Sequence, residues 1–358
     1  MTLVDDTVAA IPSLDAAAMS AAQERLDRLT KPPGSLGRLE SLVVQLAGVR
    51  GATLPSIEHR AIVVMAADHG VAARGVSAYP SAVTGQMVEN FLAGGAAINA
   101  LGRQLGARLI VVDMGVSARV PARDGLVSRW LAAGTRDMSI EPAMTRSQAT
   151  AGIEAGIEIA SDLASQGIEL LIPGEMGIGN STAAAAIVAV LTDRPAAEVT
   201  GRGTGLADAG LARKVELIDA AIAHHRLEDG DPIAVLAAVG GFEIAGIVGL
   251  VLGAAAARVA VVLDGFIVGA AALVAAGIAP ALGPHLIAGH RSTEPGHRVT
   301  LDALGLRPIL ALDLRLGEGT GAAVAVGVVD AALRMYREMA TFEEAAVSGR
   351  TPDGGSTR

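Results

Sequence analysis

Six short apolar runs recur along the chain, and they constrain the fold more than any other feature. Runs of Val, Ile, Leu and Ala with almost no charge are typical of strands buried on both faces of a parallel sheet. The runs cover residues 61–65, 109–112, 170–172, 259–263, 285–287 and 309–312. Helical patterns separate most of them, at 81–101, 146–165, 181–191, 207–224 and 241–257. This alternation predicts an α/β fold with a doubly wound, mostly parallel sheet of about six strands.

Each apolar run ends at a polar or glycine-rich cluster. The clusters are Asp68–Gly70, Asp113–Gly115, Gly174–Gly177, Asp264–Gly265, Gly289–Ser292 and Asp313–Gly319. In an open α/β sheet, ligands bind beyond the carboxyl ends of the strands, and parallel strands bring those ends to one edge. The sequence therefore predicts a single polar, glycine-lined cleft that several clusters build together.

The two ends of the chain have a different pattern. Residues 14–29 and 36–49 have helical spacing, the segment Lys31–Gly34 joins them, and no strand pattern lies nearby. We expect residues 1–58 to form a small helical subdomain, completed by a C-terminal helix at about 322–346. Residues 59–321 then form the large α/β catalytic domain, and the polar tail 347–358 is expected to be disordered.

Charge and composition exclude several classes of protein. The formal net charge of -9 and the lack of a basic run argue against nucleic acid as a partner. The chain has no cysteine, which excludes disulfides, thiolate nucleophiles and cysteine-ligated metals and fits a reducing, cytoplasmic location. The N-terminal segment has two early aspartates and no basic region, so it does not resemble a secretory signal.

One uncharged segment, residues 266–284, is about long enough to span a bilayer. It consists mostly of Ala and Gly, and it lacks flanking Trp, Tyr or Lys anchors. We therefore expect a buried helix and no membrane partner. A membrane transport protein built on residues 244–284 remains the alternative.

The segment Gly174–Thr182 follows a predicted strand and opens an alanine-rich helix. Backbone amides at a helix N-terminus, bared by glycines, suit a phosphate group. The segment matches neither the P-loop nor the dinucleotide-binding fingerprint. A tight turn with an Asn or Ser cap is equally compatible with this spacing.

A second glycine loop, Gly201–Leu206, also precedes a helix, and Lys214 follows two turns later. Lysine is scarce, since the chain contains only Lys31 and Lys214. A lysine near two glycine loops suits a phosphate, although on residue type alone a solvated surface lysine is the simpler interpretation.

Glu318 lies between two glycines in the segment Leu314–Gly321, at the end of the last apolar run. Glycines let a substrate approach the backbone closely, and a carboxylate in a dry site has a raised pKa and can act as a base near neutral pH. A glutamate that caps the following helix is the competing interpretation.

Asp68, His69, His290 and His297 raise the question of a metal site. The two later histidines are seven residues apart across a Pro-Gly pair, which is a weak metal-binding pattern. We expect hydrogen-bonded structural histidines and no metal or other cofactor. A metal-dependent hydrolase remains the alternative, whereas no Gly-x-Ser-x-Gly segment supports a serine hydrolase.

Taken together, eight segments resemble one family, the nicotinate-nucleotide–dimethylbenzimidazole phosphoribosyltransferases of cobalamin biosynthesis. Each segment is modest alone, but they occur in one order over residues 31–321. They are Lys31–Glu40, Ala67–Ala72, Gly75–Pro80 with Gln86-Met87, Gly174–Thr182, Gly201–Leu206, Gly240–Ala245, Gly289–His297 and Leu316–Gly321. The resemblance implies a Rossmann-like large domain, a small helical domain and a homodimer. It also implies two small-molecule substrates, nicotinate mononucleotide and 5,6-dimethylbenzimidazole, which give α-ribazole 5′-phosphate and nicotinate.

The resemblance also implies roles for particular residues. Glu318 becomes the general base, and Glu175 lies at the ribose and nicotinate end of the nucleotide. The phosphate-binding residues would be Gly177, Gly179, Asn180, Ser181, Gly203 and Lys214. The base pocket would draw on Ser77, Tyr79, Gln86 and Leu316. A regulator that binds the nucleotide without catalysis is a third alternative.

Overall fold

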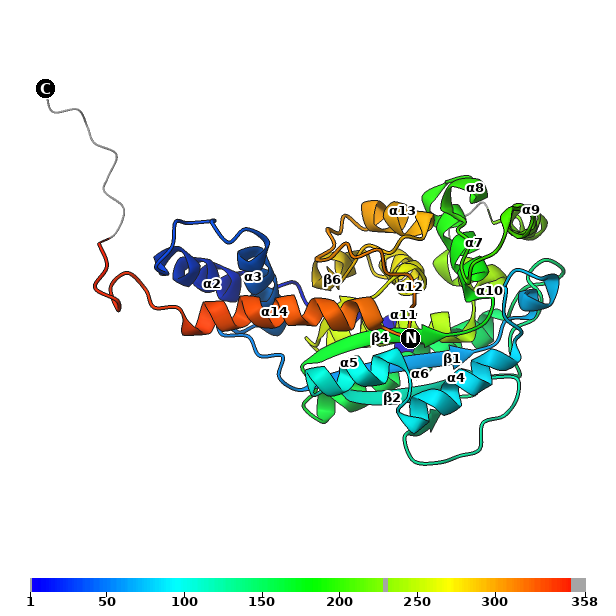
Figure 1. Cartoon of the computed structure of the whole chain (residues 1–358), viewed down its shortest axis with the longest axis horizontal. Helices are drawn as coiled ribbons and strands as arrows, with labels where there is room; N and C mark the ends of the chain where they lie inside the picture. Colours follow the sequence, from blue (N-terminus) through cyan, green and yellow to red (C-terminus); the bar gives the residue numbers. More distant parts are fainter. Residues whose placement is uncertain (1, 228–230, 349–358) are drawn as a thin grey trace, which may run out of the picture. The chain divides into compact units, whose positions relative to one another are not determined.

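The computed structural model describes residues 2–227 and 231–348, and its largest element is a six-stranded sheet in which all strands are parallel (Figure 1). The strand order is β3-β2-β1-β4-β5-β6. The strands are β1 (Arg60–Ala67), β2 (Arg108–Gly115), β3 (Leu126–Ser128), β4 (Leu170–Met176), β5 (Ala260–Leu263) and β6 (Leu286–Ala288). The order reverses direction at β1, as in doubly wound folds. The predicted fold class is confirmed.

Five of the six predicted strands are present, and the sixth prediction is wrong. Residues 309–312 form no strand. They run beside the end of β6, where the Ile309 amide donates to the Ala288 carbonyl at 3.0 Å, and their one bridge is the parallel pair His290 and Leu310. The run follows Pro308, and Leu312 is 53% exposed, so the segment lies outside the buried sheet. The sixth strand is instead β3, whose three residues are too short and too exposed to show a pattern.

Helices cover both faces of the sheet. In Figure 1, α4 (Ala82–Ala93) and α5 (Ala97–Leu105) lie in front of it, and α6 (Arg146–Ser165) and α11 (Phe242–Ala256) lie behind. The single helix expected at 81–101 is two helices, because Gly94 adopts a φ of 82° that ends α4. A reciprocal pair of hydrogen bonds between Thr145 and Gln148 caps the start of α6.

The remaining elements of the large unit surround this core. Of those that later carry site residues, α7 spans Asn180–Thr192, α9 spans Asp208–His225 and α12 spans Phe266–Ile278. The other helices are α1 (Leu3–Ala10), α8 (Ala196–Val199), α10 (Pro232–Val239), α13 (Pro295–Ala303) and the 3-10 helices η1 (Gly70–Arg74) and η2 (Pro280–His285).

The uncharged segment 266–284 is the buried helix that we expected. It folds as α12 followed by η2, and most of α12 is buried in the core. Over the described ranges 2–227 and 231–348, no helix combines the length and apolar character needed to cross a membrane.

The chain divides into two compact units, Met1–Ser13 with Ile57–Val326, and Leu14–Ser56 with Gly327–Arg358. The smaller unit contains α2 (Ala16–Arg28), α3 (Arg38–Arg50) and the later part of α14 (Thr320–Glu338). Within it, the Tyr336 hydroxyl donates a hydrogen bond to the Thr53 carbonyl at 2.9 Å. Residues 1–13, which the sequence-based division put in the small subdomain, group with the larger unit, where α1 packs against α6 and α11. Most of the tail expected to be disordered, 349–358, lies outside the described residues.

The contact between α6 and α11 depends on glycine. A Cβ at Gly156 would collide with the carbonyl oxygen of Gly246, and a Cβ at Gly249 would collide with that of Ile153. Because backbone oxygens cannot rotate away as a flexible side chain can, the two helices approach each other only where these Cβ atoms are absent. This close contact holds the helical layer behind β1 and β4, and so supports the sheet edge that bears the site.

Gly156→Ala should lower the free energy of unfolding by about 1–3 kcal/mol, the usual cost of overpacking a tight core. Denaturant unfolding followed by circular dichroism measures this. Gly327→Ala is the matched control, because Gly327 is exposed within α14 and its Cβ would meet nothing within 4 Å. An equal loss of stability in both variants would contradict the packing argument.

Candidate active site

The first glycine loop leads directly from β4 into α7, within the large unit. Glu175 on β4 is buried, and its Oε2 accepts a hydrogen bond from the Asn180 side-chain amide at 2.5 Å. The residue before α7 is Gly179, with a φ of 100°, and no side chain caps the helix. The turn therefore lacks the Asn or Ser cap that its sequence also allowed, and this helix N-terminus remains suited to an anion.

Lys214 is completely buried, which rules out the solvated lysine that its sequence context allowed. Its Nζ donates to the Ser181 hydroxyl at 2.9 Å and to the Gly201 carbonyl at 3.3 Å. Burial lowers the pKa of Lys214 to about 8, while the nearby Glu294 carboxylate opposes the shift. Lys214 thus joins the first glycine loop to the second and brings a cation to both.

The second glycine loop is held by the acidic side chain of Glu294. The Gly203 amide donates to Glu294 Oε1 at 3.1 Å, and a Cβ at Gly203 would approach the Ser181 hydroxyl to 2.8 Å. The predicted phosphate residues Asn180, Ser181, Gly203 and Lys214 are therefore brought together by the fold.

Glu318 occupies a backbone conformation that is unusual for glutamate. Its φ is 62°, and its neighbours Gly317 and Gly319 both have a φ of 89°. The side chain is buried, and its Oε2 accepts a hydrogen bond from the Ile98 amide at the start of α5, at 3.4 Å. Burial raises the pKa of Glu318, the Ile98 amide opposes this, and the charge of Asp264 raises it further. A raised pKa makes this carboxylate a stronger proton acceptor than an ordinary glutamate.

The competing interpretation, that Glu318 caps α14, does not match the structure. Asp264 takes that role, since it accepts the amide N–H groups of Gly319 and Ala322 at 3.2 and 3.0 Å. The Glu318 side chain therefore does not cap α14, although it precedes the start of that helix.

Glu175 lies next to the Glu318 segment. A Cβ at Gly317 would collide with Oε1 of Glu175, so glycine is needed for the two segments to approach. Burial raises the pKa of Glu175 to about 8, with the Asn180 amide opposing and Asp264, Glu243 and Glu318 adding to the rise. At neutral pH Glu175 is therefore mostly protonated and can donate a hydrogen bond to a substrate.

The predicted base-side residues line a more open region. Tyr79 and Leu316 are 56% and 60% exposed, and Gln86 is exposed on α4. The Ser77 hydroxyl lies 3.1 Å from the Thr204 hydroxyl, which also accepts the Ala78 amide at 2.9 Å. The base-side loop, residues 77–86, is therefore tied to the second glycine loop through Thr204.

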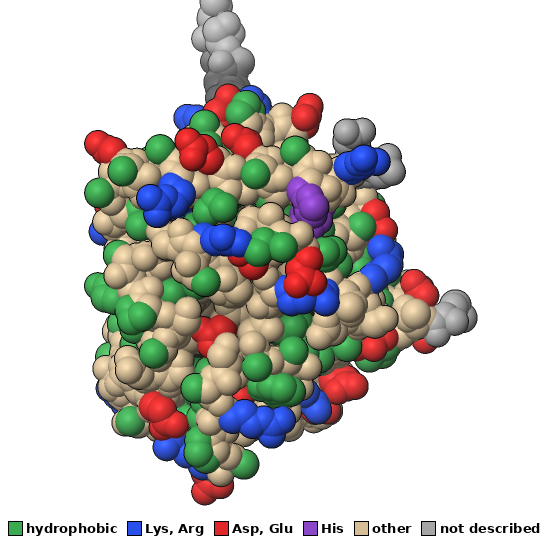
Figure 2. Space-filling view, turned by 90° about the vertical axis from the view of Figure 1, so that its right-hand side faces the viewer, with side chains coloured by type: hydrophobic (Ala, Val, Ile, Leu, Met, Phe, Trp, Pro, Cys, Tyr) green, Lys and Arg blue, Asp and Glu red, His purple; other side chains and the backbone are tan. Residues whose placement is uncertain are grey.

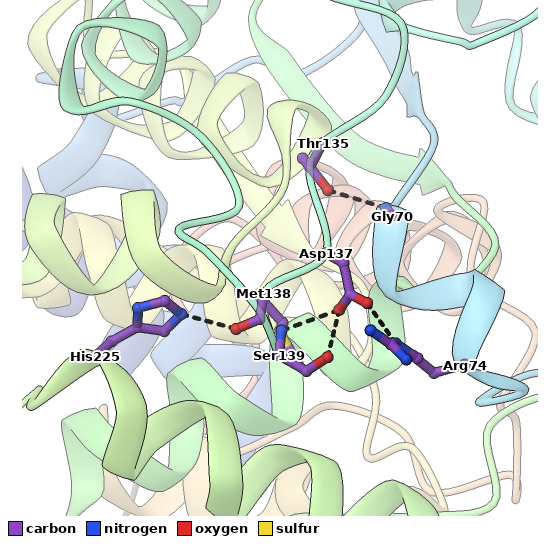
Figure 3. Close-up of polar contacts among 7 residues, drawn as sticks. All are labelled: Gly70, Arg74, Thr135, Asp137, Met138, Ser139 and His225. Atoms are coloured by element: carbon purple, nitrogen blue, oxygen red, sulfur yellow. Dashed lines mark hydrogen bonds and ion pairs between the residues drawn. The ribbon is translucent and has the colours of Figure 1, made fainter.

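The 3-10 helix η1, which precedes the base-side loop, is anchored by the segment between β3 and α6 (Figure 3). Thr135 accepts the Gly70 amide at 3.3 Å, and Arg74 forms an ion pair with Asp137 at 2.5 Å. One residue further on, the Met138 carbonyl accepts a hydrogen bond from the His225 ring at 2.7 Å. His225 ends α9, the helix that carries Lys214, so this segment links the base side to the nucleotide side.

The residues that could have suggested a metal site are engaged in separate interactions. His69 pairs with Glu243 at 2.6 Å, and His290 lies 3.4 Å from Asp264. The His297 ring accepts the Ser292 amide at 2.9 Å. Within residues 2–227 and 231–348, the structure groups no three His, Cys, Asp or Glu side chains so that they could hold a metal ion.

Three buried acids were not singled out from the sequence as site residues. Glu243 pairs with His69, Glu294 holds the second glycine loop, and Asp264 caps α14. Asp264 gave the clearest signal, because it directly follows an apolar run. Glu243 and Glu294 lie within longer motifs, and the spacing of those motifs does not indicate which individual residue has a role. A small cavity at this edge is lined in part by Glu175, Asp264, His290, Glu294, Arg315 and Gly317.

Charge is mixed on the molecular face shown in Figure 2. Acidic and basic side chains alternate there with hydrophobic ones and do not gather by sign. Such a face lacks the single-sign field typical of surfaces that attract polyanions.

The fold and the site together define a class of enzyme, one that binds a phosphorylated sugar at a glycine-lined sheet edge beside a buried carboxylate. In agreement, a family model described as phosphoribosyltransferase matches residues 11–347. A nicotinate-nucleotide–dimethylbenzimidazole phosphoribosyltransferase from Roseiflexus sp. (strain RS-1) is 57% identical over 350 residues, covering 98% of this chain and 99% of the relative. The enzyme of that name from Desulforudis audaxviator (strain MP104C) is 51% identical over 348 residues, covering 97% and 99%.

A solved structure agrees with these relatives. The crystal structure of CobT from Thermus thermophilus has a TM-score of 0.90 at 49% identity and covers 93% of this chain and 99% of its own. The chain belongs to the nicotinate-nucleotide–dimethylbenzimidazole phosphoribosyltransferase family.

Lys214→Ala should raise the KM for the nucleotide by about 10–100-fold, the range for losing a hydrogen bond to a charged group, and should change the KM for the base far less. Steady-state kinetics with each substrate varied in turn measures both constants. In the unaltered enzyme, the nucleotide KM should rise as pH passes about 8, because Lys214 is charged only below its pKa. Arg213→Ala, which removes an exposed neighbouring cation, is the control. Equal effects of Lys214→Ala on both substrates would argue against a phosphate role.

Proposed function

We propose that the protein transfers the phosphoribosyl group of nicotinate mononucleotide to 5,6-dimethylbenzimidazole, giving α-ribazole 5′-phosphate and nicotinate. The product is the nucleotide that forms the lower ligand of cobalamin. The family and its named relatives support this reaction. The observation that carries it is a buried Glu318 with a raised pKa, which lies between two glycines on the same sheet edge as the hydrogen-bonded pair Ser181 and Lys214.

Glu318 suits the chemistry of the attacking base. A neutral benzimidazole has one pyridine-like nitrogen and one N–H. When the pyridine-like nitrogen attacks C1′ of the ribose, positive charge grows on the ring. A carboxylate on the N–H side relieves that charge by accepting the proton, and a raised pKa makes Glu318 a better acceptor.

The other half of the reaction needs little help from the protein. The nicotinate of the nucleotide is already a pyridinium, so it leaves as a neutral ring without an acid. Attack from the opposite face inverts the β-nucleotide to an α-riboside. No metal is required in principle, and catalysis becomes mainly positioning plus one base.

The nucleotide side is assigned to the two glycine loops. The loop from Gly177 to Ser181 and the Lys214 cation bind the phosphate, with Gly203 beside them. Glu175, protonated at neutral pH because its pKa is about 8, donates a hydrogen bond at the ribose and nicotinate end. The wall against the base is formed by Ser77, Tyr79, Gln86 and Leu316, where the exposed Tyr79 ring and Leu316 side chain suit a flat apolar ligand.

The family resemblance and the cysteine-free composition carry two further parts of the proposal. The enzyme acts as a homodimer, and a measurement of its mass in solution, compared with the 35.9 kDa of one chain, tests this. It works in the cytoplasm.

Incubation with nicotinate mononucleotide and a panel of benzimidazoles and purines tests the reaction directly. We expect nicotinate release that depends on the added base, and a product whose glycosidic bond is α by NMR. Binding of the nucleotide with no nicotinate release would instead favour the regulator. Activity that is lost in chelator and restored by a metal ion would favour the hydrolase.

Glu318→Gln should keep both substrates bound and lower kcat by about 10²–10⁴-fold, the usual contribution of a general base. Stopped-time assays of nicotinate give kcat, and calorimetry gives the two dissociation constants. Glu338→Gln, a change of an exposed glutamate on α14, should leave kcat unaltered. Near-normal turnover in Glu318→Gln would remove this residue from the role of base.

A further inference from the structure

One buried carboxylate fastens the segment that carries Glu318. Asp264 follows β5 and is 2% exposed. Its Oδ2 accepts the Gly319 amide at 3.2 Å, and its Oδ1 accepts the Ala322 amide at 3.0 Å. Amides in the first turn of a helix have no partner within the helix and lie at its positive end, so an anion is favourable there. Asp264 therefore fixes the first turn of α14 from a different strand.

The segment before α14 needs such a fastening. Glu318 has a left-handed φ of 62°, which is a strained conformation for a residue with a side chain. A conformation of this kind persists only when its surroundings hold it. The Gly319 amide that binds Asp264 directly follows the strained residue, so breaking this bond frees the backbone that aims Glu318.

His290 holds Asp264 from the other side. Its Nε2 lies 3.4 Å from Asp264 Oδ1, and both side chains are at most 3% exposed. A Cβ at Gly321 would collide with the His290 ring, so the ring lies directly against the first turn of α14. His290 thus touches both the carboxylate and the helix that the carboxylate caps.

We propose that Asp264, oriented by His290, is a positioning residue that holds Glu318 in its base-competent conformation. Both Asp264 oxygens are engaged by backbone amides that follow Glu318, so this carboxylate acts on the Glu318 segment. The inference rests on the proposed role of Glu318 as the base.

The charge of Asp264 gives the positioning role a second consequence. Glu318 is faced by Asp264 from the end of β5, by Glu175 from the end of β4 and by the Ile98 amide at the start of α5. After burial, the negative charge of Asp264 is what raises the pKa of Glu318. A neutral residue at 264 should therefore lower that pKa, so that Glu318 stays unprotonated to a lower pH.

Asp264→Asn tests both consequences. Asparagine keeps the shape but offers one acceptor oxygen, so one of the two backbone amides loses its partner. We expect kcat to fall about 10–100-fold, the order of loss that a small misplacement of a catalytic group causes. The nucleotide KM should change less than about threefold, and the acid limb of the kcat–pH profile should move to lower pH. Asp302→Asn, which changes an exposed aspartate on α13, should alter neither.

A pair of changes at His290 tests the positioning role without altering the charge at 264. Glutamine keeps an N–H donor near the place of Nε2, whereas leucine fills the space without one. His290→Leu should lower kcat at least about tenfold and His290→Gln should recover most of it. If Asp264→Asn does not fold, as thermal unfolding would reveal, the contrast between these two variants decides the matter.

The outcomes separate this inference from the assignment of Glu318. An inactive Glu318→Gln together with an Asp264→Asn that keeps the normal kcat and acid limb would overturn the positioning role alone. A loss of kcat in Asp264→Asn with an unmoved acid limb, and equal losses in both His290 variants, would mean that Asp264 supports the fold only. A fully active Glu318→Gln would overturn the assignment of the base itself.

Discussion

Several carboxylates are buried at one edge of the sheet, and the arrangement of the site depends on how four of them, Glu175, Glu243, Asp264 and Glu318, are compensated. A buried carboxylate is costly unless it is hydrogen-bonded or protonated. Asp264 is held by two backbone amides, Glu243 by His69 and Glu175 by Asn180, while Glu318 has only the long contact to the Ile98 amide. The least compensated acid is the one assigned to catalysis, and it is the one that gains most from meeting an N–H of the substrate.

Glycines also contribute to this arrangement, because they let the segments that carry the buried carboxylates approach one another. Side chains at Gly317 or Gly321 would collide with Glu175 or with the His290 ring. Farther from the site, glycines in α6 and α11 allow the same closeness between helices. Part of the abundance of glycine in this chain is therefore explained by close contacts, with backbone atoms in the core and with side chains at the site.

Long β-branched runs and motif-bearing loops were predictable from the sequence, while short or partner-dependent features were not. Residues 61–65 and 170–172 are strands because they are apolar on both faces. The run 309–312 is equally apolar but lies outside the sheet, and β3 is too short to show a strand pattern. Lys214 and Glu318 were noticed from their glycine-rich surroundings, whereas the role of Glu175 was predicted only from the family resemblance. The role of Asp264 was hidden because it depends on amides 55 and 58 residues away in the chain.

Thr204 couples the two sides of the site in a way that bears on how such an enzyme changes its preference. Its hydroxyl bonds Ser77 and Ala78 on the base-side loop, while its own loop is held through Gly203 and Gly201 by Glu294 and Lys214. A substitution that widens the base-side loop for a bulkier heterocycle also shifts the second glycine loop, which is assigned to the sugar phosphate. Selectivity for one substrate and affinity for the other are thus constrained to evolve together.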